Sequence, residues 1–388
     1  MRGTPVRWIG VLLVFGVMWT IWAPVRQHYQ NFLLERACLS EESEDQKECW
    51  AEHVTQRIVE NDVVSAFRSL AYLYENRLEL RRDCSEVGIL VARNLSEYDF
   101  DPHTTQWAPE SAYCNFSFYK EYPRVVLLRT KDVEQVSDFC SVIAETFPEQ
   151  LRYSIDCYRG IGYALPFIVS GTDGHTVIQN VIEICERIVK RPEDREGCAE
   201  GGFNRVAYRE REHSLFTGSG EGELSLCATQ VPRYRDRCYG TYKGAAFLDT
   251  EDSEKSLSDV VRSTKGGYAG HPELKELFAQ IAWAYGYQRV YQNSVHISYE
   301  DLVDMCTTED AYAYQQCLYG LADGLAKNGT PGSEYRDVVA LCEVIEGRGD
   351  YKCVNDSSLA FLRTYYGLEK FREACNVFGK LKDEIPCS

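Results

Sequence analysis

The sequence lacks most of the features that mark a catalytic, metal-binding or nucleic-acid-binding protein. Its seven histidines are scattered over 388 residues, and no two of them stand four apart on a helix to share a metal ion. It contains no Gly-x-Ser-x-Gly elbow and no Cys-x-x-Cys. Positive charge is scarce, because 42 Lys and Arg face 59 Asp and Glu for a net charge of −17, and nucleic acids require a basic surface. We therefore expect no cofactor, no metal and no nucleic-acid partner.

Long hydrophobic runs are also rare, and only Trp8–Ala23 has sixteen residues without a charge. This run is slightly short of the roughly 20 residues that cross a bilayer comfortably, but tryptophans stand at both of its ends, as interfacial residues do. Arg2 and Arg7 would also suit a cleaved signal peptide, yet no small-x-small cleavage site is evident. The pattern predicts a short cytoplasmic tail at residues 1–7, an uncleaved transmembrane anchor at residues 8–25, and a domain over residues 26–388.

Cysteine, in contrast, is abundant, and its number, 16, is even. Zinc ligands and catalytic thiols usually form closer couples than these cysteines do. Buried free thiols in a cytosolic repeat protein are the alternative, but the spacing favours short disulfide loops in an oxidising compartment. We expect an extracytoplasmic domain, periplasmic or extracellular, in which neighbouring cysteines pair in order: Cys38–Cys49, Cys84–Cys114, Cys140–Cys157, Cys185–Cys198, Cys227–Cys238, Cys306–Cys317, Cys342–Cys353 and Cys375–Cys387.

A period of about forty residues organises the chain. PEDREGCAEGG (Pro192–Gly202) and PRYRDRCYGTYKG (Pro232–Gly244) both place a proline six residues before a cysteine, with glycine close behind. HPELKELFAQIAWAYG (His271–Gly286) keeps the proline but has Phe278 at the cysteine position. A fixed period of this size is typical of stacked helical units, an α-solenoid.

Each unit reads as two helices. The first, or A helix, is amphipathic and ends in a cysteine, as in VEQVSDFC (to Cys140) and IQNVIEIC (to Cys185). The second, or B helix, begins near the proline and carries glycines after its cysteine, which predicts a close approach between neighbouring helices. One unit lacks both cysteines: Ser263 stands at the first cysteine position and Phe278 at the second. Loss of both together is what a disulfide within the unit predicts. The fold class predicted is all-α: an N-terminal transmembrane helix, then about nine helical hairpins, most closed by a disulfide.

Two segments depart from the regular units. The long insertion between Cys84 and Cys114 reads as a surface loop. The cysteine-free unit carries an aromatic group, Trp283, Tyr285, Tyr287 and Tyr291. Packing between helices explains most tyrosines of a repeat protein, but tyrosine and tryptophan also dominate binding surfaces. We therefore take these four residues as the candidate partner-binding site, on the hairpin expected to open most readily.

On these residues the chain resembles the broad class of helical-hairpin repeat proteins, tetratricopeptide and Sel1-like. CYRGIGYAL (Cys157–Leu165) also resembles a Cys-aromatic-His-Gly-x-Gly-His repeat of bacterial exported proteins, with Arg159 and Tyr163 standing where that repeat has histidines. The resemblance implies a bacterial envelope protein.

The leading hypothesis is a membrane-anchored scaffold that binds a protein or peptide, because helical-hairpin arrays usually bind rather than catalyse. The alternative is an enzyme with a closed α/α toroid, cutting a glycan with paired carboxylates. The sequence leaves the oligomeric state open.

Overall fold

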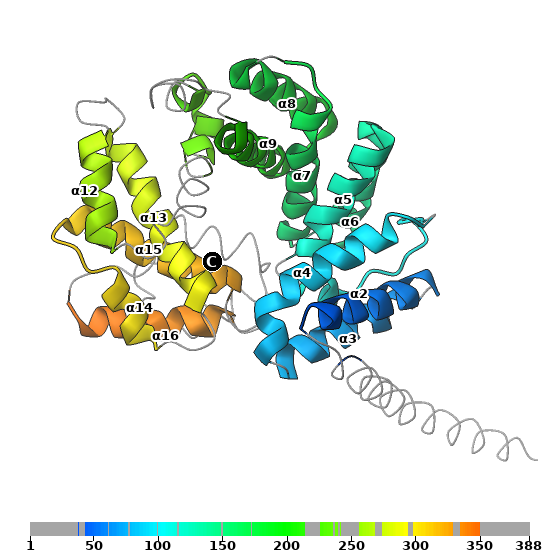
Figure 1. The fold of residues 1–388 in the computed structure, drawn as a ribbon, viewed down its shortest axis with the longest axis horizontal. Coiled ribbons are helices and arrows are strands. Elements are labelled where there is room, and N and C mark those ends of the chain that lie inside the picture. The colour runs from blue at the N-terminus through cyan, green and yellow to red at the C-terminus, as the bar shows by residue number, and fades with distance from the viewer. Residues whose placement is uncertain are drawn as a thin grey trace, which may run out of the picture. The chain divides into compact units, whose positions relative to one another are not determined.

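A computed structural model describes the following residues: 38, 43–60, 62–76, 78–98, 100–114, 116–148, 150–171, 173–213, 226–235, 237–239, 241, 256–267, 274–293, 298–328 and 334–349. Within these residues every regular element is a helix, as predicted (Figure 1). The anchor predicted at residues 8–25 lies outside them. Among the described helices, none combines the length and the hydrophobicity needed to cross a bilayer.

The helices have the following bounds: α2 (Ser43–Val59), α3 (Val63–Asn76), α4 (Leu78–Leu95), α5 (Ser117–Thr130), α6 (Val133–Thr146), α7 (Arg152–Ala164), α8 (Gly174–Ile188), α9 (Pro192–His213), α12 (Leu257–Gly267), α13 (Leu274–Asn293), α14 (Tyr299–Met305), α15 (Ala311–Asn328) and α16 (Glu334–Gly347), with short 3₁₀ helices η1 (Pro109–Ala112) and η2 (Leu165–Phe167).

Six disulfides join cysteines in the predicted order: Cys38–Cys49, Cys84–Cys114, Cys140–Cys157, Cys185–Cys198, Cys227–Cys238 and Cys306–Cys317. Cys342 is disulfide-bonded as well. Its predicted partner Cys353, and the predicted pair Cys375–Cys387, lie outside the described residues. Three bonds each close an A–B hairpin: α6 to α7, α8 to α9, and the end of α14 to α15. The pairing predicted from spacing is confirmed wherever both cysteines are described.

The chain divides into two compact units, the first ending at Phe118 and the second beginning at Tyr119. In the first unit the insertion before Cys114 is more than a surface loop. It contains η1, and its Trp107 is only 8% exposed, with ring centroids 6.0 Å from Phe118 and 6.5 Å from Phe67. Burial of this tryptophan anchors the insertion to the core of its unit.

In the second unit, the A helices begin with side-chain caps. Asp132 accepts a hydrogen bond from the backbone N of Gln135, and Asp173 accepts one from the backbone N of Thr176, both at 2.9 Å. Ser298 caps α14 in the same way. The B helix α9 begins at Pro192, where a proline loses no helical hydrogen bond. Local capping therefore accounts for where these helices start.

Candidate functional site

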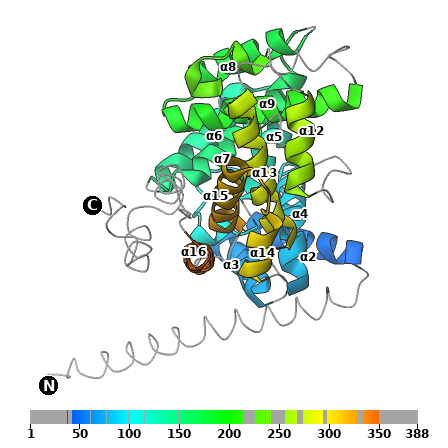
Figure 2. The same cartoon turned by 90° about the vertical axis from the view of Figure 1, so that its left-hand side faces the viewer.

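The B helices α7 and α9 lie side by side at backbone contact distance (Figures 1 and 2). A Cβ on Gly162 of α7 would lie 2.7 Å from the carbonyl carbon of Cys198 and closer still to its oxygen. Reciprocally, a Cβ on Gly201 of α9 would lie 3.0 Å from the carbonyl carbon of Arg159. Real Cβ atoms do not approach so closely, so only glycine permits this packing. The predicted role of the repeated glycines is confirmed here.

The same reciprocal contact joins α13 and α15. A Cβ on Gly286 would lie 2.9 Å from the carbonyl carbon of Cys317, and one on Gly320 would lie 2.8 Å from that of Trp283. Gly286 and Trp283 on α13 thus correspond to Gly162 and Arg159 on α7. Because the same backbone contact occurs in both helix pairs, it can be used to align the residues of one repeated hairpin with those of another.

This alignment corrects the prediction that Phe278 occupies the cysteine position. Gly162 follows Cys157 by five residues, and the residue five before Gly286 is Ile281. Phe278 lies almost one turn earlier, where its ring is 5.2 Å from Lys265 Nζ of α12. The sequence alignment was wrong by three residues because apolar residues recur every three to four positions along a helix, so neighbouring turns look alike in sequence.

Two positions of each B helix lie beside the glycine contacts, the second and sixth residues after the cysteine position. We call their occupants the row residues: Lys120 and Arg124 on α5, Arg159 and Tyr163 on α7, Glu200 and Asn204 on α9, Trp283 and Tyr287 on α13, and Tyr319 and Asp323 on α15. Lys120 is aligned through its carbonyl, which faces Gly160. Arg159 and Tyr163 are the residues that stand in place of histidines in the resembling repeat. Because each pair is spaced four apart, both side chains share one helix face.

On α5, α7 and α9 the row residues contact one another across the helices. Arg159 reaches Glu200 Oε2 at 2.8 Å and also pairs with Asp156, which is fully buried. Asp156 receives Arg152 at 3.3 Å and Lys120 at 3.7 Å as well. A buried carboxylate with three cations is stabilised in its charged form and is costly to leave unpaired. This ion-pair cluster therefore holds the three helices in register.

The sixth positions add an aromatic contact. The Tyr163 ring has the Arg124 guanidinium 5.9 Å from its centroid on the α5 side and that of Arg205 5.6 Å away on the α9 side. Arg205 also lies 4.3 Å from the ring of Phe167, which is 42% exposed. Cations at these distances are attracted to the ring face. The result is a partly exposed face that combines charge and aromatic surface.

The four aromatic residues predicted to bind a partner fall into different environments. Trp283 and Tyr287 are half-buried, and their rings stack with centroids 5.3 Å apart. The Trp283 indole donates to Asp323 Oδ2 at 2.8 Å. Tyr285 is only 2% exposed, which makes it a core residue. The side chain of Tyr291 lies outside the described part of the chain.

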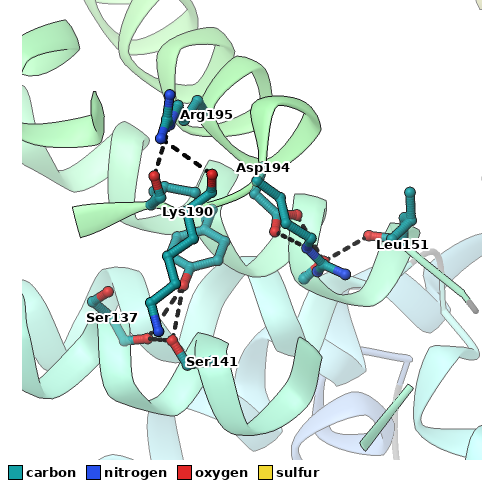
Figure 3. A network of polar contacts seen from close by, with 10 residues as sticks. Ser137, Ser141, Leu151, Lys190, Asp194 and Arg195 are labelled. Carbon is teal, nitrogen blue, oxygen red and sulfur yellow. Dashed lines mark hydrogen bonds and ion pairs between the residues drawn. The ribbon is translucent and has the colours of Figure 1, made fainter. Parts of the chain in front are cut away.

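A second polar network surrounds Asp194 at the start of α9 (Figure 3). Asp194 accepts from Ser154 and from Arg191, both at 2.7 Å. Arg195 donates to the carbonyls of Val189 and Lys190, which secures the turn that leads from α8 into α9. Burial raises the pKa of Asp194, although these hydrogen bonds oppose the rise.

The neighbours of this network are as deeply buried as its carboxylate. Tyr158, whose hydroxyl lies 3.1 Å from Ser141 Oγ, is 3% exposed, and Ser154 is 1% exposed. No substrate reaches a serine or tyrosine in that position, so the network positions helices rather than catalyses a reaction.

Of the row residues, the sequence singled out Trp283 and Tyr287 as candidates but not Lys120, Arg124 or Asp323. The signal for these residues was their spacing from the cysteine position, which becomes meaningful only once the glycine contacts define the helix face. Across the described residues, no group of histidine, cysteine and acidic side chains is arranged to hold a metal ion. Comparison with known proteins finds no matching family, no matching curated protein and no matching solved structure.

Proposed function

We propose that this protein is a membrane-anchored scaffold whose extracytoplasmic α-solenoid of disulfide-closed hairpins binds a protein or peptide through the row residues. One observation carries the proposal. The glycine-to-carbonyl contact is the same in α7–α9 and in α13–α15, whereas the row residues beside it differ at three of the four corresponding positions; only Tyr163 and Tyr287 are alike. A constant packing contact with variable neighbouring side chains is what repeat proteins use to build a binding surface.

The disulfides support an oxidising compartment for the helical domain, because such bonds persist outside the cytosol. Each small loop that they close stabilises the folded chain by about 2–3 kcal/mol in the chain-entropy account. With the uncharged run at Trp8–Ala23, this supports an N-terminal anchor with the repeats outside the cytoplasm.

Buried carboxylates argue for binding rather than hydrolysis. A glycosidase needs two carboxylates that face a substrate, whereas Asp156 and Asp194 are 0% and 2% exposed and are held by arginines. These two groups hold helices together. Among the row residues, Asn204, Trp283 and Tyr287 are half-buried and remain for contact with a partner, whereas Asp323 is only 8% exposed.

Site-specific photocrosslinking in intact cells tests the proposal. A photoreactive residue at Asn204, a half-buried row residue, is compared with one at Tyr98, which is 48% exposed in the first unit. We expect a discrete cross-linked partner from Asn204 and none from Tyr98. Equal labelling at both positions, or none at any row residue, would contradict a row-based scaffold.

The location is tested separately by digesting spheroplasts with an external protease and mapping the released peptides without reduction. Release of the helical domain with its cysteines paired in sequence order is the expected result. Protection from the protease, together with reactive thiols, would place the domain in the cytosol instead.

A further inference from the structure

We propose that the row residues Trp283, Tyr287 and Asp323 form a recognition site for a cationic side chain, lysine or arginine, of a basic peptide segment. This inference rests on the proposed function, whose partner it describes chemically. Nothing in the sequence pattern paired Asp323 with the aromatic residues. The contact between α13 and α15 brings them together.

The geometry joins three groups that together favour a cation. Trp283 and Tyr287 stand four residues apart on α13 and stack with an interplanar angle of 27°. Asp323 on α15 accepts the indole N–H of Trp283 at 2.8 Å. Donation of that N–H to a carboxylate increases the electron density of the indole ring, which strengthens its attraction for a cation. Indole is already the side chain that binds cations best through its face.

The same helices already use this kind of contact within the chain. Arg289 lies 4.5 Å from the ring of Tyr285, and Lys275 on α13 lies 5.4 Å from the ring of Tyr312 on α15. Lysine and arginine therefore dock on aromatic rings at several points along this helix pair. Trp283 and Tyr287 are half-buried, so a cation supplied by a partner has access to them. Asp323 is only 8% exposed, so its carboxylate acts on that cation through its charge and through its bond to the indole rather than by direct contact.

The charge of the surroundings selects a cation over a neutral or acidic ligand. From Ser256 to Gly349 the sequence has thirteen Asp and Glu against seven Lys and Arg. The whole chain carries −17. An acidic field of this kind attracts a basic segment and repels an acidic one, and the attraction weakens as salt is added. A neutral sugar would stack on the rings but gain nothing from the charge.

Binding of short probe peptides to the oxidised full-length protein tests the site. The probes are tetra-arginine and tetra-lysine, with tetra-glutamate and the neutral sugar chitotetraose for comparison, followed by calorimetry and by tryptophan fluorescence. Trp50 and Trp107 are 4% and 8% exposed, so the fluorescence of the described region responds mainly at Trp283. We expect the basic probes to bind and change the emission, with affinity falling as salt rises.

Variants then locate the binding. Asp323→Asn keeps an acceptor for the indole N–H but removes the charge, and it should weaken the basic probes about tenfold, within the range of a desolvated cation–aromatic contact. Trp283→Phe should also weaken them, whereas Tyr287→Phe keeps a ring and should change affinity less than Tyr287→Leu. The matched control is Glu343→Gln on α16, which removes one exposed negative charge from a helix that carries none of the three site residues and should leave affinity unchanged.

Three outcomes overturn the inference: no binding of the basic probes, equal binding to the Asp323→Asn and Glu343→Gln variants, or preferential binding of the sugar or of tetra-glutamate. These outcomes are distinct from failure of the proposed function. A partner cross-linked from Asn204 and captured equally well by the Asp323→Asn protein would leave the scaffold standing and refute only the cationic site.

Discussion

Replacing Gly320 by alanine tests whether α13 and α15 are held together at backbone distance. The added Cβ would lie 2.8 Å from the carbonyl carbon of Trp283 and 2.9 Å from the backbone nitrogen of Tyr287. Ordinary contacts of a Cβ lie at 3.4–4 Å, and the crowded atoms are helix backbone, which no rotamer change can move. The two helices must therefore separate along their contact.

The sign of the effect follows from two opposing terms. Overpacking of this kind costs about 1–3 kcal/mol, and we expect the upper end because both crowded partners are backbone. Alanine in place of glycine inside a helix gains at most about 1 kcal/mol. The net expectation is a loss of roughly 2 kcal/mol in the free energy of unfolding of this helix pair. Adding Gly286→Ala should cost less than its single effect, because the helices have already moved apart.

The matched control is Gly347→Ala at the end of α16, where nothing beyond its chain neighbours and its own helix backbone lies within 4 Å of the added Cβ. That variant should be neutral or stabilised by up to about 1 kcal/mol. Chemical denaturation of the oxidised proteins compares the variants, and amide exchange in α13 and α15 localises the change. If Gly320→Ala proved as stable as Gly347→Ala, the glycine contact would not be what aligns the repeat.

Three further predictions follow from the same geometry. The double variant Ser263→Cys with Ile281→Cys should form an added disulfide under oxidation and raise thermal stability, whereas Ser263→Cys with Phe278→Cys should leave free thiols, as peptide mapping would reveal. Amide exchange should be faster in the α12–α13 hairpin than in the disulfide-closed α14–α15 hairpin, and equal rates would remove the reason to expect local opening there. Because burial raises the pKa of Asp194 above its ordinary 3.8, the folded chain binds a proton at this carboxyl more tightly than the unfolded chain does. Protonation of Asp194 therefore stabilises the folded chain at low pH, and this contribution is lost as the pH rises through the folded pKa. Denaturation at a series of pH values from Asp194's ordinary pKa of 3.8 upward should show this loss in the native protein and not in Asp194→Asn.

The aromatic prediction shows how far helix periodicity reaches. The four candidates Trp283, Tyr285, Tyr287 and Tyr291 look equivalent in sequence because they are close together and chemically alike. On a helix, residues two apart point to nearly opposite faces, whereas residues four apart share one. The structure accordingly buries Tyr285 and leaves Trp283 and Tyr287 half-buried on a common face.

The sequence by itself determined the helical class, the A–B hairpins and the cysteine pairing of the described residues. Those features are local: five of the six described disulfides join cysteines 11 to 17 positions apart, and Cys84–Cys114 joins cysteines 30 apart. Caps such as Asp132 and Asp173 act within one turn. The tertiary structure alone decided the register of the cysteine-free unit, the ion pairs that join Lys120 to Asp156 and Arg159 to Glu200, and the contact of Trp283 with Asp323 forty residues away. Those features depend on the register in which one helix packs along another. A hydrophobic pattern that repeats at every helical turn is compatible with several registers, so the sequence alone does not determine which one forms.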